Sequence, residues 1–206
     1  MSSISPIRNP KTDALITPEN AALVIIDYQP TQVHSVNSTD TASLVKGILN
    51  AASIAKLYRL PIVLSTVNVT SGRSQDTISA LRERVGDIPS YDRTTINAWE
   101  DEGFYEAVKE TGRKKLIMCA LWTEACLTFP SLDALREGYE VYPLVDAVGG
   151  TSKLAHKTAL RRLEQAGAKL ITTPQLACEL QRDWNRSETV AGFTQALFDT
   201  GAFVKL

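Results

Sequence analysis

Short apolar runs alternate with amphipathic stretches along most of the chain. The runs are apolar at consecutive positions, as expected of strands that are covered by helices on both faces. They predict strands at Ala21–Asp27, Pro61–Val67, Lys115–Leu121, Tyr139–Val145 and Ala168–Thr172. Because strands that alternate with helices form βαβ units, the pattern predicts an α/β fold with a mostly parallel central sheet.

The amphipathic segments between these runs predict the helices. They comprise residues 41–59, 100–112, 123–138, 151–167 and, ending in an apolar tail, 183–206. Pro130 lies inside one predicted helix and Pro143 inside one predicted strand. Since proline has no backbone N–H to donate, we expect a kink at Pro130 and a strand end or edge at Pro143.

The chain has 206 residues and no Pro/Gly/Ser-rich linker in its middle, which indicates a single domain over residues 1–206. Within it we expect an N-terminal arm at residues 1–17 and a C-terminal tail at residues 185–206 that packs on a neighbouring subunit. No apolar run has the length of a signal peptide or a membrane span, so the sequence predicts a cytoplasmic protein.

Charge patterning limits the partners. The formal net charge is -1, and acidic and basic residues are interspersed. This pattern gives no basic surface for nucleic acid and no polybasic patch for a membrane, and favours a small, weakly charged substrate. No His, Cys or carboxylate spacing indicates a metal site, and no glycine-rich phosphate-binding loop indicates a nucleotide, so we expect no metal and no cofactor.

Polar residues at the ends of apolar runs are the candidates for chemistry, because ligands of open parallel sheets bind beyond the carboxyl ends of the strands. Asp27 ends the first run. A partly desolvated carboxylate there can act as a general base toward a thiol and as a general acid toward a leaving amine. A cap for the following loop is an equally good explanation of Asp27.

Cys126 follows the run that ends at Leu121, at the predicted start of a helix. Unpaired backbone N–H groups at that position lower a thiol pKa, so we expect a nucleophilic thiolate. The alternative is a buried cysteine that only packs, which we prefer for Cys119 and Cys178. The chain contains two histidines, of which His156 lies in mid-helix and His34 in a loop, so a Cys–His dyad is poorly supported.

Arg93 lies between the loop GDIPSYD and the segment TTINAW. A guanidinium near a thiolate and a carboxylate would favour both ionised forms. For a lone arginine, a surface ion pair is normally the better explanation. Only the combination with Asp27 and Cys126 makes Arg93 a site candidate.

Taken together, several motifs resemble the isochorismatase-like cysteine hydrolases. They are IIDYQ, RTTINAWED, LWTEAC and DALREGYEVYPLVDA, and TTINAWED with LACELQRDW resembles the YcaC-related branch of that family. The resemblance extends from about Pro18 to Trp184. It implies a three-layer αβα Rossmann-like fold, a homo-oligomer, which is octameric in that branch, and a catalytic triad of Asp27, Arg93 and Cys126.

Arg93 departs from the family pattern, in which lysine is usual at this position. Because a guanidinium does not release its proton at accessible pH, we assign Arg93 an electrostatic role only. The resemblance also implies a cis peptide at Leu121–Trp122 and an oxyanion hole formed by the N–H groups of Trp122 and Cys126. Trp122 and Phe129 would make a narrow aromatic substrate pocket, although Phe129 also fits a core position.

The resemblance implies hydrolysis of a small amide-like or related C–N substrate through a thioester-like intermediate on Cys126. Nicotinamidases of this family bind a metal through Asp and His after the second strand, and residues 65–75 here contain neither. Isochorismatases proper lack the cysteine. The alternative function is a non-catalytic binding or assembly protein that keeps the hydrolase scaffold.

Overall fold

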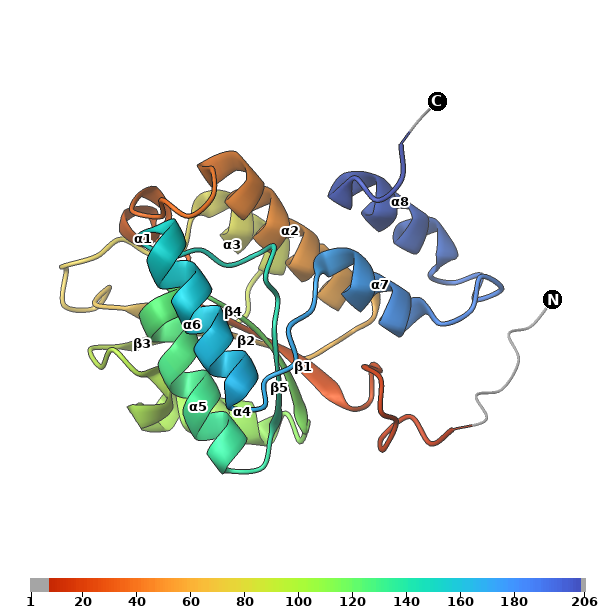
Figure 1. The fold of residues 1–206 in the computed structure, drawn as a ribbon, viewed down its shortest axis with the longest axis horizontal. Coiled ribbons are helices and arrows are strands. Elements are labelled where there is room, and N and C mark those ends of the chain that lie inside the picture. The colour runs from red at the N-terminus through yellow and green to blue at the C-terminus, as the bar shows by residue number, and fades with distance from the viewer. Residues whose placement is uncertain (1–7, 205–206) are drawn as a thin grey trace.

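Five parallel strands form the centre of the molecule in the computed structural model, which describes residues 8–204 (Figure 1). The strands are β1 (Ala21–Ile26), β2 (Ile62–Val67), β3 (Ser90–Arg93), β4 (Lys115–Ala120) and β5 (Glu140–Pro143). Their order across the sheet is β3-β2-β1-β4-β5, and every neighbouring pair is parallel. The predicted parallel α/β sheet is therefore confirmed.

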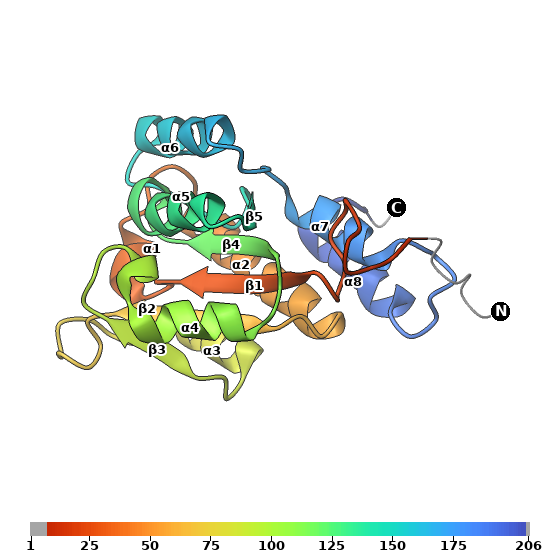
Figure 2. The same cartoon turned by 90° about the horizontal axis from the view of Figure 1, so that it is seen from below.

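Helices cover both faces of this sheet and make three layers (Figures 1 and 2). One face carries α1 (Pro30–His34), α2 (Thr41–Leu57), α3 (Ser79–Val85), α7 (Thr173–Gln181) and α8 (Val190–Thr200). The other face carries the 3-10 turn η1 (Ala98–Glu100), α4 (Glu102–Glu110), α5 (Thr128–Arg136) and α6 (Lys153–Gln165), and the π-helical turn η2 (Thr123–Leu127) precedes α5. This is the three-layer αβα arrangement that the family resemblance implies.

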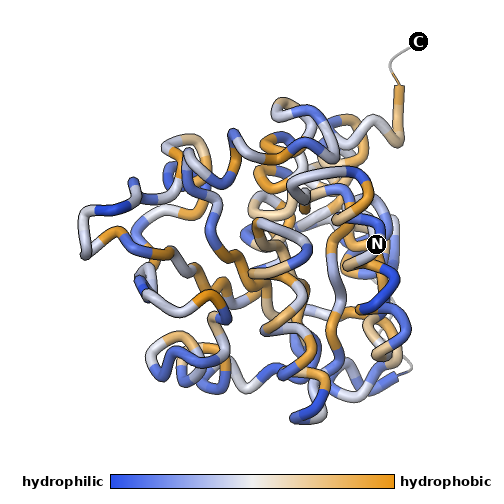
Figure 3. The backbone as a smooth tube through the Cα atoms, turned by 60° about the vertical axis from the view of Figure 1, so that its left-hand side comes forward, coloured by the Kyte–Doolittle hydropathy of each residue, from blue (hydrophilic) through white to orange (hydrophobic). Residues whose placement is uncertain are grey.

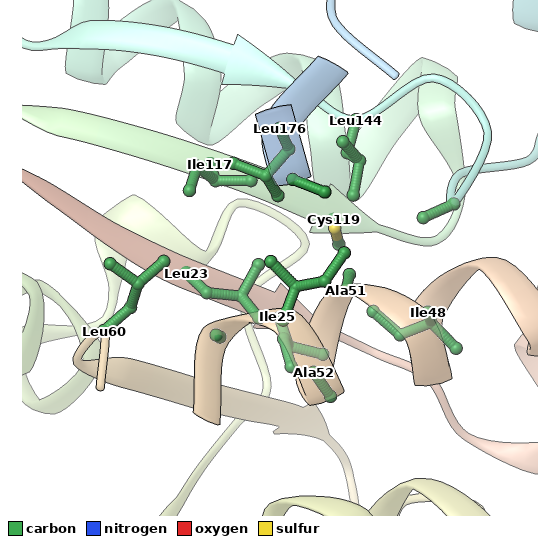
Figure 4. Close-up of a cluster of buried hydrophobic side chains, with 14 of the residues drawn as sticks. Leu23, Ile25, Ile48, Ala51, Ala52, Leu60, Ile117, Cys119, Leu144 and Leu176 are labelled. Atoms are coloured by element: carbon green, nitrogen blue, oxygen red, sulfur yellow. The ribbon is translucent and has the colours of Figure 1, made fainter. Parts of the chain in front are cut away.

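Alternate residues of β1 point to opposite faces of the sheet, so this strand contributes to two hydrophobic cores. Leu23 and Ile25 point into the core under α2 and α7, where Cys119 also packs (Figure 4). Val24 and Ile26 point into the opposite core under α4 and α5. All six residues of β1 are buried, which is why the strand lacks polar alternation. Along the helices, hydrophobic positions recur between hydrophilic ones (Figure 3).

The strand order places a topological switch point between β1 and β4. From β1 the chain proceeds outward to β2 and β3, and it then returns to the other side of β1 for β4 and β5. Because loops after β1 and β4 leave in opposite directions, a crevice opens beyond their carboxyl ends. The residues that follow β1 and β4 are Asp27 and the turn that carries Cys126.

The predicted strand at 168–172 is wrong. Only Ile171 forms a bridge there, with Leu144. Pro143 supplies the physical reason. The N–H groups of Leu144 and Val145 point to opposite sides, toward Met118 and Ile171 respectively, so the N–H that Pro143 lacks would face the 168–172 segment. The regular ladder stops, and β5 ends at Pro143 as expected.

Several predicted helix bounds also change. The segment 123–138 begins as the π turn η2, so its irregularity lies before Pro130, which is the third residue of α5. The helix expected over 183–206 is confined to α8, and the sequence pattern did not predict α1, α3 or β3. Part of the expected N-terminal arm, residues 1–7, lies outside the described residues. Between residues 8 and 204, no helix combines the length and apolar character needed to cross a bilayer.

Candidate active site

Asp27 occupies a constrained position immediately after β1. Its φ is 63°, in the left-handed region that aspartate tolerates better than most residues. Its N–H donates to the carbonyl of Ser65 at 3.0 Å, which continues the ladder between β1 and β2 by one residue. The residue is fully buried. Beyond this backbone turn the carboxylate accepts hydrogen bonds from Arg93.

A bidentate ion pair joins Asp27 to Arg93, the last residue of β3. The two terminal nitrogens of the guanidinium donate to the two carboxylate oxygens at 2.7 and 2.8 Å. Both side chains are 0% exposed. A fork-to-fork pair of this kind fixes orientation as well as charge, which a lysine could not do in the same way.

Further acceptors hold the guanidinium in place. Arg93 also donates to the hydroxyl of Ser65 at 3.1 Å and to the carbonyls of Thr66 and Ile96 at 3.0 and 3.2 Å. Burial by itself would lower the pKa of Arg93, but the hydrogen bonds and the charge of Asp27 outweigh it and raise the pKa. The arginine is therefore a permanent cation. Its Nε is buried and has no partner within residues 8–204.

Gln29 stabilises the same edge of the sheet through side-chain hydrogen bonds. Its Nε2 donates to Ser74 Oγ and the Gln75 carbonyl at 2.8 and 2.7 Å, and its Oε1 accepts from the N–H of Val67 at 2.9 Å. The side chain is 0% exposed. This one amide therefore ties the segment after Asp27 to the end of β2 and to the loop beyond it.

Cys126 lies in the π turn η2. The N–H of Leu127 donates to the Trp122 carbonyl at 3.2 Å, an i→i+5 bond, and the Thr128 hydroxyl donates to the Thr123 carbonyl at 2.6 Å. The peptide bond between Leu121 and Trp122 is cis, as the family resemblance implies. Within this turn the partly buried thiol lies near the Asp27 carboxylate and the backbone N–H of Trp122, and both groups shift its pKa.

The expected depression of the Cys126 pKa is wrong. Burial, followed by the charge of Asp27 and the hydrogen bond to it, raises the pKa of Cys126 from 9.0 to about 12. Arg93 and the Trp122 N–H act in the opposite direction but do not prevail. The reason is geometric, because Arg93 directs its terminal nitrogens at the carboxylate. At neutral pH the resting residue is a thiol beside a base.

The two predicted pocket aromatics differ in their surroundings. Trp122 donates its indole N–H to Ser35 Oγ at 2.7 Å and packs against the core under α2. Phe129 lies one turn after Cys126 and is 36% exposed, so it is not a core residue. The indole of Trp122 is therefore held in place, whereas the ring of Phe129 is partly exposed.

The remaining cysteines and histidines lie apart from Asp27. Cys119 is buried, as expected, and burial raises its pKa well above the ordinary value. Cys178 is exposed on α7 and does not pack as we expected, because its position on the helix faces away from the core. His34 is exposed on the rim of a depression of about 490 Å³ between α1 and residues 72–75. The Nδ1 of His156 lies 2.9 Å from the Thr123 hydroxyl.

The structure thus brings Asp27, Arg93 and Cys126 together, and it adds residues that the sequence reasoning missed. Ser65 and Thr66 hold the guanidinium. Ser65 had a signal, since its hydroxyl is a polar group inside an otherwise apolar run, whereas Thr66 contributes only its backbone carbonyl, which any residue would supply. The contact between Thr123 and His156 had no sequence signal. Over residues 8–204, no group of three or more His, Cys, Asp or Glu side chains is arranged to hold a metal ion.

Comparison with known proteins agrees with this geometry. The chain is 36% identical over 166 residues to the probable hydrolase YcaC of Escherichia coli, which covers 80% of this chain and 79% of that protein. The structure of YcaC from Pseudomonas aeruginosa with hexane-2,5-diol and covalent acrylamide superposes with a TM-score of 0.85 at 32% identity, over 92% of this chain and 93% of that one.

The crystal structure of Escherichia coli YcaC, described as an octameric hydrolase of unknown specificity, gives a TM-score of 0.80 at 30% identity, over 94% of this chain and 100% of that one. The model of the isochorismatase domain matches residues 21–175, which include Asp27, Arg93 and Cys126. The chain therefore belongs to the isochorismatase family.

Proposed function

We propose that this protein is a cysteine hydrolase of a small amide-like or related C–N substrate. One observation carries the proposal: at the switch point of the sheet the carboxylate of Asp27 lies near enough to the Cys126 thiol to shift its pKa, and it accepts two hydrogen bonds from the Arg93 guanidinium. A nucleophile, its base and the group that orients the base are the minimal parts of nucleophilic catalysis.

The raised pKa of Cys126 decides when its proton leaves. Because the resting thiol is not ionised at neutral pH, Asp27 removes the proton as the sulfur attacks the substrate carbonyl carbon. A C–S bond forms and the carbonyl π electrons move to oxygen. Asp27 then returns the proton to the leaving nitrogen as the C–N bond breaks, which leaves a thioester.

Hydrolysis of the thioester repeats the same proton path. Asp27 takes a proton from water as the hydroxide attacks the thioester carbon, and the sulfur leaves with that proton as a thiol. Arg93 keeps its proton throughout and balances the charge of Asp27. The products are a carboxylic acid and an amine or ammonia.

Backbone amides of the turn provide the oxyanion hole in this proposal. In the resting protein the Trp122 N–H lies near the sulfur of Cys126 and acts to lower its pKa. Once the sulfur bonds to carbon, the N–H groups of Trp122 and Cys126 are free to receive the substrate oxygen. Each such donor contributes about 2.7–4 kcal/mol in the transition state. Trp122 and Phe129 flank the substrate.

The relatives support a hydrolytic role and a reactive site, but they name no substrate. Escherichia coli YcaC is a probable hydrolase of unknown specificity. The Pseudomonas aeruginosa relative has covalent acrylamide. Acrylamide is a small amide whose double bond reacts with thiols, so it is a suitable probe for this chain as well.

A hydrolysis screen over small amides and hydroxamates tests the proposal. We expect release of ammonia or amine by the wild-type protein and loss of that activity in Cys126→Ala, since no other thiol faces Asp27. Cys178→Ala, which changes an exposed thiol, is the matched control and should retain full activity. Activity that survives Cys126→Ala would refute the nucleophile, and a purely binding or assembly role predicts no activity in any variant.

We also propose a cytoplasmic homo-oligomer with the C-terminal segment at a subunit interface. Trp184, Phe203 and Val204 are 59%, 40% and 76% exposed and lie together with α8 at one end of the molecule (Figure 2). Exposed apolar groups of this size favour a protein interface. Light scattering coupled to size-exclusion chromatography should give a mass several times that of one chain, and a monomer would contradict this proposal.

A further inference from the structure

A second cluster of polar residues lies behind the turn that carries Cys126. The segment from Gly149 to the start of α6 runs along the turn and contacts it through both backbone and side chains. Thr123 donates its N–H to the Gly149 carbonyl at 2.9 Å, and the Thr151 N–H donates to Glu124 Oε1 at 2.9 Å. The first two residues of η2, Thr123 and Glu124, are therefore held by hydrogen bonds to a segment outside the candidate active site.

His156 adds a further contact between α6 and the turn that contains Cys126. Its Nδ1 and the hydroxyl of Thr123 are 2.9 Å apart, and Thr123 is fully buried. The start of α6 fixes the imidazole, because Ser152 caps the helix through the N–H of Ala155 at 3.1 Å. The hydrogen bond therefore joins a capped helix to a buried side chain of the turn.

The packing at this point leaves little room for movement. A Cβ placed on Gly150 would lie 2.4 Å from Glu124 Oε2 and 3.1 Å from the Cβ of His156. Both distances are shorter than ordinary contacts. Gly150 therefore has no room for a side chain beside Glu124 and His156, and the segment before α6 packs closely against the turn at this point.

Thr123 connects this cluster to the reactive sulfur. It directly follows Trp122, whose backbone N–H lies near the Cys126 sulfur and acts on its pKa, and its carbonyl accepts from the Thr128 hydroxyl at 2.6 Å. A rotation of Thr123 would therefore redirect the Trp122 amide and move the π turn. His156 touches neither Cys126 nor Asp27 through any hydrogen bond within residues 8–204.

From these contacts we propose that His156 is a positioning residue, which acts through Thr123 to hold the Trp122 amide and the Cys126 sulfur in reactive alignment. The inference rests on the proposed function, since it assumes that Cys126 is the nucleophile. Burial, together with the charge of Lys157, lowers the pKa of His156, while the charge of Glu124 opposes this shift. A neutral imidazole at pH 7 fits a partner that is a hydroxyl.

The test compares His156→Ala with His156→Asn in the full-length protein, by the rate of acrylamide addition to Cys126 at pH 7 followed by peptide mapping. Misalignment of reacting groups typically costs up to about 100-fold in rate, so we expect a loss of about 10- to 100-fold in the alanine variant. Asparagine places a polar atom near the position of Nδ1 and should restore the rate to within about threefold of wild type.

Two further variants separate alignment from stability. Leu160→Ala removes an apolar contact of the same helix, so it should lower the melting temperature and leave the acrylamide rate unchanged. Thr123→Val removes only the hydroxyl, and it should reproduce the loss seen in His156→Ala without adding to it in the double variant.

The outcomes distinguish the inference from the function on which it rests. A wild-type protein that forms no adduct at Cys126 would overturn both. Normal addition in wild type and an unchanged rate in His156→Ala would overturn the positioning role alone. Additive losses in the double variant with Thr123→Val, or a loss in Leu160→Ala equal to that in His156→Ala, would also overturn it.

Discussion

Replacing Asp27 with asparagine is expected to reduce the hydrolytic rate by about 100- to 10,000-fold, the usual contribution of a general acid–base. Asparagine has nearly the same shape as aspartate and also tolerates the left-handed backbone at this position, where φ is 63°. It cannot accept the proton of Cys126. Initial rates on any amide found in the screen measure the effect.

The same substitution should destabilise the fold, because it leaves the cation of Arg93 buried without its counter-charge. Removing one partner of a buried pair typically costs about 3–5 kcal/mol of unfolding free energy. Urea unfolding measures the change. The double variant Asp27→Asn with Arg93→Gln contains no buried charge at this position, so it should be more stable than Asp27→Asn alone.

Measuring both activity and stability separates the loss of the base from the loss of the folded structure. The double variant should regain stability without regaining activity, since it still lacks a base. An Asp27→Asn protein that is folded at the assay temperature and hydrolyses substrate at the wild-type rate would eliminate Asp27 as the acid–base. Equal stability of Asp27→Asn and wild type would show that the buried pair contributes little.

The second prediction concerns the pH dependence of Cys126 as a thiol. A pKa of about 12 means that its modification by a small neutral thiosulfonate should increase about tenfold per pH unit from pH 7 to 11, without a plateau near pH 9. Mass spectrometry of the Cys126 peptide gives the rate. A plateau below pH 9 would show that the sulfur is ionised at rest.

The raised pKa of Cys126 also makes the free energy of unfolding depend on pH. Because the pKa of Cys126 is higher in the folded protein than its ordinary value of 9.0, its contribution to stability is fully present below pH 9. That contribution is lost as the pH rises through the interval from 9 to about 12. The protein should therefore become easier to unfold over this alkaline range.

Asp27→Asn should speed up thiosulfonate modification of Cys126 and slow down substrate hydrolysis. It removes the negative charge and the hydrogen bond that raise the pKa of Cys126, and it leaves Arg93, which lowers that pKa. Thiosulfonate modification at pH 9 should therefore become faster as hydrolysis becomes slower. A variant in which both rates fall together would indicate that the turn has collapsed rather than that the base has been lost.

Much of this arrangement was predictable from apolar runs and strand ends. Continuous burial on both faces of β1 and β4 gives uninterrupted apolar runs, so these strands and the residue Asp27 could be identified. β3 escaped prediction because its residues are polar and only partly buried up to Arg93, as edge strands often are. Arg93 became a candidate through its combination with Asp27 and Cys126 rather than through a strand pattern.

Features that depend on contacts between distant segments of the chain could not be predicted from the sequence. The pKa of Cys126 depends on which groups surround the sulfur, and the sequence showed only its place near a helix start. The Asp27 carboxylate and burial dominate there, and both arise from the packing of β1 against β4. Likewise, Thr123 and His156 are 33 residues apart, and no periodicity relates them.

The central claim is that the Cys126 sulfur attacks with Asp27 as its base, and acrylamide at pH 7 tests it most directly. Peptide mapping should find the adduct on Cys126 in the wild-type protein, and amide hydrolysis should fall in step with that modification and by at least about 100-fold in unmodified Asp27→Asn. An adduct on the exposed Cys178 with Cys126 unmodified, or hydrolysis by Asp27→Asn at the wild-type rate, would contradict the claim.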